Sequence, residues 1–131
     1  MYWYEKDYIM RLIHGVAQMI ARLFLGKQME EEGELITLRD QRARDQNDCL
    51  RRMIDERKVN AAEEKLFDLL ENAVWDDREK ASLAISFYDY LNGKDDEFLT
   101  EADFSRDEII TGMEDALKLA NMEIPEYLRL D

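Results

Sequence analysis

The chain has 131 residues, of which 46% are apolar and 37% charged, and its net charge is −13. This length allows roughly two-thirds of the unfolded surface to be buried, so we expect a single domain over residues 1–131. The negative charge argues against nucleic-acid binding, and the longest apolar run is far shorter than the roughly 20 residues of a membrane span.

The first predicted element is a helix from about Asp7 to Leu25, followed by Gly26 in a left-handed conformation. Its polar side chains fall on one narrow stripe, made of Arg11, His14, Gln18 and Arg22. A helix that is apolar on most sides is either a core element, a homodimer seam or a membrane-surface helix. The last is disfavoured because a broad basic face is lacking. The candidate partner-binding residues on this helix are Tyr8, Leu12 and Met19.

The next stretch mixes polar and apolar segments. Residues 27–34 form an acidic loop, and the apolar residues from Leu35 to Leu38 open a second helical stretch. Residues 39–48 are polar except for Ala43, so they form either an exposed helix or a break. Apolar periodicity resumes from Leu50 to about Arg57.

Three later helices are expected from capping signals. An N-cap residue is followed three positions later by an acid in each case: Asn60 with Glu63, Asp76 with Glu79, and Ser105 with Glu108. Phe104 and Ile109 stand where a hydrophobic staple would form. These signals predict helices over about 60–73, 76–91 (stopping at Asn92-Gly93) and 105–121. Residues 94–104 form a connector with one helical turn around Phe98 and Leu99.

The sequence therefore predicts an all-α fold of five or six helices, packed as successive antiparallel hairpins. The pairs are about 46–57 with 60–73, and 76–91 with 105–121. The spacing of Val59, Ala62, Leu66 and Leu69 resembles the second helix of a tetratricopeptide repeat, although the usual preceding glycine is absent. A right-handed superhelix and an irregular bundle are both compatible with this pattern.

Metal and cofactor chemistry lacks its usual residues in this sequence. With one histidine and one cysteine, neither a di-iron bundle site nor a zinc finger can be assembled. A calcium loop beginning at Asn92, Asp95 or Asp103 would need a glycine at its sixth position, which is instead Glu97, Thr100 or Glu108. No glycine-rich loop precedes a basic residue and a hydroxyl. We expect no metal and no cofactor.

Nucleophilic catalysis would depend on Cys49 or a serine near a base. Arg51 and Arg52 lie close to Cys49 in the sequence and could lower the pKa of its thiol, but a cysteine in such a context is usually not a nucleophile. His14 is expected to be a partly exposed residue on the polar face of its helix. No catalytic residue is predicted. A single cysteine and an N-terminus without the order of a signal peptide favour a cytoplasmic location.

Four aromatic residues gather around the helix at 76–91: Trp75, Phe87, Tyr88 and Tyr90. Positions 87, 88 and 90 cover much of a helix circumference, so at least one ring is expected to point away from the immediate core. Packing between helices is one interpretation, and a partner groove is the other. The candidates for partner contact are Trp75, Phe87 and Tyr90.

Three blocks of sequence resemble an uncharacterised family of short helical proteins from Firmicutes-type bacteria, a family of unknown function. They are Tyr4-Glu5-Lys6-Asp7-Tyr8-Ile9-Met10-Arg11, Phe87-Tyr88-Asp89-Tyr90-Leu91-Asn92 and Phe104-Ser105-Arg106-Asp107-Glu108-Ile109. The resemblance spans nearly the whole chain. It implies a single cytosolic bacterial domain and brings no catalytic residues with it.

The leading functional hypothesis is a non-enzymatic domain whose first helix or helical grooves bind a protein partner or a second copy. One alternative is a small-molecule binder or enzyme with a pocket between the aromatic residues of helix 76–91 and the last helix. The other is an acidic modulator of a basic partner, because residues 59–131 carry 7 basic and 20 acidic side chains.

Overall fold

A computed structural model describes residues 2–24 and 41–122. Within these ranges there are six helices and no strand, which confirms the predicted all-α class. The helices are α1 (Tyr2–Phe24), α2 (Gln41–Asp55), α3 (Val59–Leu70), α4 (Asp77–Asn92), α5 (Asp96–Glu101) and α6 (Arg106–Leu119). The predicted loop at 27–34, the helix start at Leu35, Gly26 and the tail after Pro125 lie outside the described residues.

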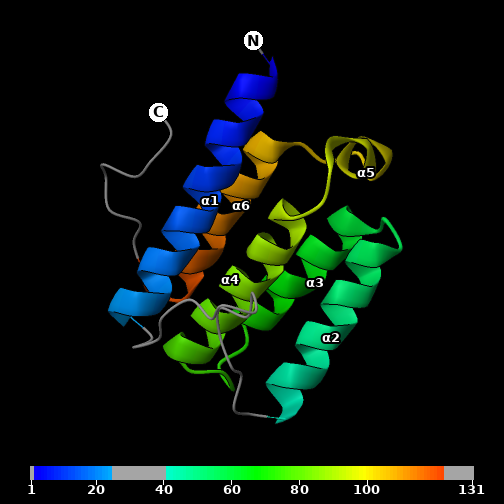
Figure 1. Ribbon diagram of the computed structural model, residues 1–131. Helices are drawn as coiled ribbons and strands as arrows, with labels where there is room; N and C mark the ends of the chain where they lie inside the picture. Colours follow the sequence, from blue (N-terminus) through cyan, green and yellow to red (C-terminus); the bar gives the residue numbers. More distant parts are fainter. Residues whose placement is uncertain (1, 25–40, 123–131) are drawn as a thin grey trace.

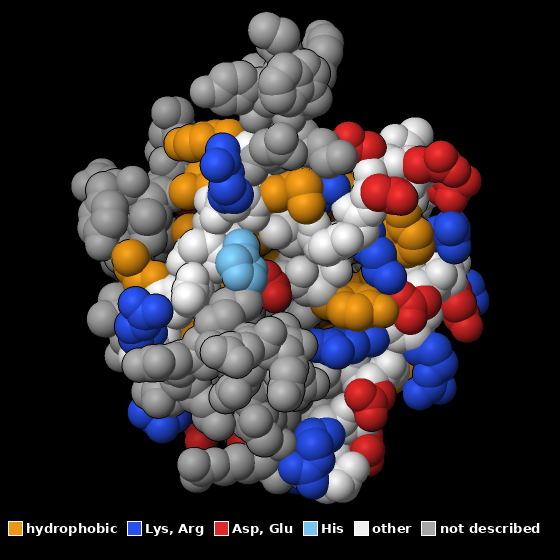
Figure 2. Space-filling model, in the orientation of Figure 1, with side chains coloured by type: hydrophobic (Ala, Val, Ile, Leu, Met, Phe, Trp, Pro, Cys, Tyr) orange, Lys and Arg blue, Asp and Glu red, His pale blue; other side chains and the backbone are white. Residues whose placement is uncertain are grey.

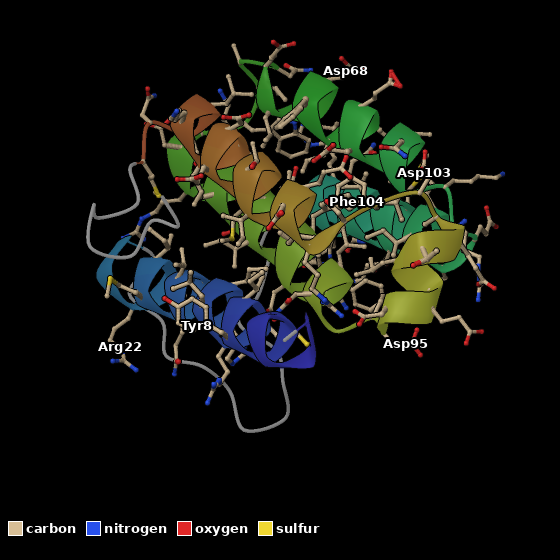
Figure 3. All side chains as sticks on the ribbon, turned by 90° about the horizontal axis from the view of Figure 1, so that it is seen from above. Tyr8, Arg22, Asp68, Asp95, Asp103 and Phe104 are labelled. Atoms are coloured by element: carbon tan, nitrogen blue, oxygen red, sulfur yellow. The ribbon has the colours of Figure 1, made fainter. Side chains whose placement is uncertain are left out.

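Helix α4 occupies the centre of the molecule and packs against α1, α2, α3 and α6. Figure 1 shows α1 and α6 on one side of α4 and α2 and α3 on the other, and Figure 3 shows from above that α6 lies against α4. Helices α2 and α3 form one antiparallel hairpin, and α4 and α6 form the other. The central position of α4 makes the fold the irregular bundle rather than a row of stacked hairpins.

The sequence of α4 explains its central position. Buried residues occur all around this helix and not on a single stripe, and they include Leu83, Ile85, Phe87 and Tyr88, each with no exposed surface. A helix that is apolar on all sides must be covered on all sides. The rings of Phe87 and Tyr88 meet edge to face, with centroids 4.9 Å apart.

Two of the predicted helix caps are confirmed and one is wrong. The carboxylate of Asp76 accepts a hydrogen bond of 2.8 Å from the Glu79 amide, and Ser105 and Glu108 form the full capping box. Helix α3, however, begins after Lys58, without a side-chain cap. The Asn60 side chain instead donates to the Asp103 carbonyl at 3.3 Å, because the loop after α5 comes close to the start of α3.

The connectors are short and well defined. The helical turn expected around Phe98 and Leu99 is α5, and residues 41–48 form the first half of α2 and not a break. Three ends adopt a left-handed backbone without glycine, at Arg57, Asp103 and Asn121. After each of them the next amide bonds back to the preceding helix, which satisfies the last carbonyl groups.

No helix in the described ranges is both long and apolar enough to cross a membrane.

Candidate functional site

The outward surface of α1 carries most of the residues that the sequence singled out on this helix. Tyr8 is 52% exposed, the largest exposure of any aromatic side chain among residues 8–22 and 41–122, and Leu12 and Met19 are half-buried on the same side. Gly15 lies between them on the solvent side of the helix. In the described part of the chain, a Cβ atom added at Gly15 would meet no neighbouring group within 4 Å.

A polar row runs beside this apolar stripe, on the edge of α1 that faces α4. It consists of Arg11, His14 and Gln18, one helical turn apart, and Arg22 lies exposed beyond them. Neither Arg11 nor Arg22 forms an ion pair with any other described residue. The narrow polar stripe expected from the sequence is therefore present, and its two arginines are not paired with an acid of the described ranges.

An open cleft of about 540 Å³ lies between α1 and the C-terminal end of α4. Its lining comes from both helices: Met10, Arg11, His14, Gly15, Gln18, Asp89, Asn92 and Gly93. Figure 2 shows the imidazole of His14, in pale blue, on the open surface of this face.

His14 and Asp89 pair across the cleft. His14 Nδ1 lies 3.1 Å from Asp89 Oδ1, with the histidine side chain 45% and the aspartate side chain 18% exposed. A carboxylate only accepts, so Nδ1 carries the shared proton and Nε2 lies on the opposite edge of the ring. Sequence reasoning missed this pair because the two residues are 75 positions apart.

Two further contacts fix the α4 wall of the cleft. The Asn92 amide donates to the Met10 carbonyl at 3.0 Å, which ties the end of α4 to α1. Behind it, the buried guanidinium of Arg106 donates to the carbonyls of Asn92 and Lys94 at 2.9 and 2.6 Å. These contacts hold the last turn of α4 at a fixed distance from α1.

The aromatic candidates are not arranged as a partner groove. Phe87 has no exposed surface and Trp75 is only 7% exposed, so packing between helices accounts for both. Tyr90 is half-buried, and two cations of the same chain lie over its ring, the Arg51 guanidinium at 4.7 Å and the Lys94 ammonium at 4.6 Å from the centroid. These contacts within the chain account for the Tyr90 ring.

The hydroxyl of Tyr90 is also engaged. It donates to Asp55 Oδ1 at 2.7 Å, and the Lys94 ammonium donates to the same oxygen at 2.9 Å. These two hydrogen bonds hold the pKa of the Asp55 carboxyl below its usual value. The cluster joins α2 to α4, and we assign it a structural role.

A second buried polar contact lies between α3, α4 and α6. The Tyr88 hydroxyl donates to Glu63 Oε2 at 2.6 Å. Burial, together with the charges of Glu108 and Asp115, raises the pKa of the Glu63 carboxyl, although the Tyr88 hydrogen bond opposes the shift. Gly112 of α6 lies against this pair, and a Cβ atom there would be 2.6 Å from the Tyr88 oxygen. The space between α4 and α6, where a pocket was one alternative, is filled at this point.

Among residues 8–22 and 41–122, no three potential ligands of the types His, Cys, Asp and Glu are grouped around a common point for a metal ion. Cys49 is half-buried on α2.

A family model described as a family of unknown function (DUF6483) matches residues 3–121. The chain belongs to this family. The match includes all three sequence blocks on which the resemblance depended, so the predicted membership of a family of unknown function is confirmed. No curated protein and no solved structure matches the chain. For this DUF6483 member, functional inference therefore depends on its own geometry.

Proposed function

We propose that this DUF6483 protein is a non-enzymatic, cytoplasmic helical domain that self-associates through the outward surface of α1. Gly15 is the observation that carries the proposal. A glycine inside an exposed helix costs roughly 0.5–1 kcal/mol relative to alanine. Nothing in the described part of the chain fills the space in front of it, so packing among the described residues gives no reason for this cost.

A helix of a second molecule packed against Gly15 would explain why a glycine stands at this position. Two helices approach most closely where they cross, and a residue without a side chain at the crossing point lets the backbones come together. Gly15 is flanked along α1 by Tyr8 and Leu12 on one side and Met19 on the other. These three are the apolar residues that the crossing would cover.

The sequence of α1 is complementary to itself when two copies cross antiparallel at Gly15. Tyr8 and Arg22 lie at equal distances on either side of Gly15, so each Tyr8 would face the Arg22 of the other copy. Each Arg11 would face a Met19. A parallel crossing would instead place Arg11 against Arg11, which like-charge repulsion disfavours.

Contacts of this kind are common in the chain itself. Arg42 lies over the ring of Trp75 at 5.4 Å, Arg51 over Tyr90 at 4.7 Å and Arg57 over Phe98 at 4.6 Å. Exposed cation–π contacts are worth about 0.5–1 kcal/mol, and more when they are desolvated. Two symmetrical contacts between Tyr8 and Arg22 would add to the apolar burial and select the antiparallel arrangement.

The test is the solution mass of the protein over a concentration series, measured by sedimentation equilibrium. A single pair of helices makes a small interface, so we expect a reversible monomer–dimer equilibrium. Gly15→Lys adds a long, charged side chain at the crossing point and should give a monomer at every concentration. Ala61→Lys adds the same side chain at an exposed position of α3 and should leave the equilibrium unchanged.

A wild-type protein that stays monomeric throughout the series would overturn the proposal. An equilibrium that Gly15→Lys and Ala61→Lys affect equally would show that α1 is not the interface. Far-ultraviolet circular dichroism of both variants checks that the helices remain folded.

A further inference from the structure

We propose that the cleft between α1 and α4 is a binding site for the zwitterionic group of a free α-amino acid. The proposal does not rest on the pairing of α1, because the cleft is formed within one chain. Its volume of about 540 Å³ lies within the range of small-molecule sites. Gly15 and Gly93 contribute no side chains to its lining, which leaves it accessible from solvent.

The two walls of the cleft carry opposite charges, and each wall has a group left for a ligand among the described residues. On the α1 wall, Arg11 has no ion-pair partner among the described residues. On the α4 wall, Asp89 bonds only to His14 through Oδ1, and within the described ranges Oδ2 has no hydrogen-bond partner. A ligand with a single charge would be attracted by one wall and repelled by the other.

A zwitterion matches both walls. The Arg11 guanidinium and the Gln18 amide, one helical turn on either side of His14, present donors for a carboxylate. Asp89 Oδ2 presents an acceptor for an ammonium group, and Nε2 of His14 presents a second one when the imidazole is neutral and donates to Asp89 from Nδ1. An α-amino acid carries these two charges on adjacent carbon atoms, and its side chain would extend over Met10 or toward solvent.

The acceptor side of the site is held in place before any ligand binds. The hydrogen bond between His14 and Asp89 orients the carboxylate, and the Asn92 contact with the Met10 carbonyl fixes the distance between the walls. Preorganised groups lose little conformational entropy on binding. This arrangement favours a site over an incidental surface hollow.

The single histidine of the chain provides a direct probe. The His14 imidazole signals can be followed by NMR while glycine, L-leucine, L-lysine or L-glutamate is added in separate titrations. We expect a saturable shift with at least one of these. The amide of that amino acid lacks the carboxylate and its N-acetyl form lacks the ammonium group, and each should bind at least about tenfold more weakly.

Two variants then test which charged group of the ligand each wall of the cleft binds. Arg11→Gln should weaken the binding of the amino acid about tenfold. It should leave the binding of the amide form unchanged, because that form has no carboxylate for Arg11 to bind. Asp89→Asn should weaken the binding of the amino acid and leave the binding of its N-acetyl form unchanged, because that form has no ammonium group. Arg22→Gln removes the same charge from α1 outside the cleft and should have no effect.

The proposal is overturned if none of the four amino acids gives a saturable shift. It is also overturned if the charge-deleted forms bind as tightly as the amino acid, or if Arg11→Gln and Arg22→Gln behave alike. Repeating the titration with Tyr8→Lys, which lies outside the cleft, separates ligand binding from the pairing of α1.

Discussion

The glycines inside α1 and α6 have opposite surroundings. Gly112 of α6 lies under the contact between Tyr88 and Glu63, where a Cβ atom would be 2.6 Å from the Tyr88 oxygen and 2.8 Å from its ring carbon Cε1. Gly15 of α1 faces solvent, with nothing near its missing side chain in the described part of the chain. The first glycine is explained by the fold, whereas the second, which lines the open cleft, has no packing contact among the described residues that explains it.

This difference separates stability from function. Three helices meet at Gly112, and its lack of a side chain lets α6 approach the polar contact that joins α3 to α4. At Gly15 the same residue type lowers the stability of an exposed helix without any gain in packing against the described residues. A cost of this kind that the fold does not offset points to an interaction with another molecule.

The largest effect is expected from Gly112→Ala. The added methyl group would collide with the Tyr88 ring, which cannot move without disturbing the core, so the free energy of unfolding should fall by about 1–3 kcal/mol despite the better helix propensity of alanine. Chemical denaturation measures this change. If the variant were as stable as the wild type, α6 would not approach Tyr88 as closely as described.

Tyr88→Phe should have the next largest effect. It removes the hydrogen bond to Glu63 and leaves a half-buried carboxylate without that donor, at a cost of about 1–2 kcal/mol. Tyr90→Phe is the matched control, because its hydroxyl bonds to the exposed Asp55 and its loss should cost less. Equal losses in the two variants would contradict the structural importance given to the Gly112 region.

Gly15→Ala should have the opposite sign. At concentrations low enough for the monomer, the free energy of unfolding should rise by roughly 0.5–1 kcal/mol, because alanine favours the helix and its methyl group meets nothing. Thermal and chemical unfolding both report this gain. A loss of stability would show that Gly15 has a role within the fold and would remove the contrast with Gly112.

The smallest effect concerns the pH dependence of Glu63. A carboxyl whose pKa is raised by folding binds more protons in the folded state, so its contribution to stability is lost as the pH rises above its unfolded value of about 4.5. Glu63→Gln keeps an acceptor for Tyr88 and removes the charge. Its stability relative to the wild type should therefore increase with pH above this value.

The exposed neighbour Glu64 provides the control for that experiment. Glu64→Gln should show no such increase, because Glu64 is exposed on the other side of α3. Parallel pH profiles for the two variants would contradict the burial assigned to Glu63.

Much of the fold could be predicted because the signals for it are local. The caps at Asp76 and Ser105 depend on residues three positions apart, and the helical turn around Phe98 follows from its neighbours. The cap at Asn60 was wrong for a long-range reason, since that side chain bonds to the loop at Asp103. The left-handed helix end at Arg57 also had no glycine to indicate it.

The candidate site was only partly predictable. The partner-binding candidates on α1 (Tyr8, Leu12 and Met19) lie on one side of that helix, whereas the candidates Trp75 and Phe87 are buried because α4 lies at the centre of the bundle. The contact between His14 and Asp89 arises only when α1 packs antiparallel to α4. No pattern along the chain encodes which helix a polar stripe will face.

The most direct test of the central claim is the dimer dissociation constant of Gly15→Ala compared with that of the wild type, measured by sedimentation equilibrium. The account predicts that this variant, although more stable as a monomer, associates at least about tenfold more weakly, because the methyl group separates the two backbones at the crossing point. Unchanged or tighter association would contradict the assignment of Gly15 to an interface between two copies.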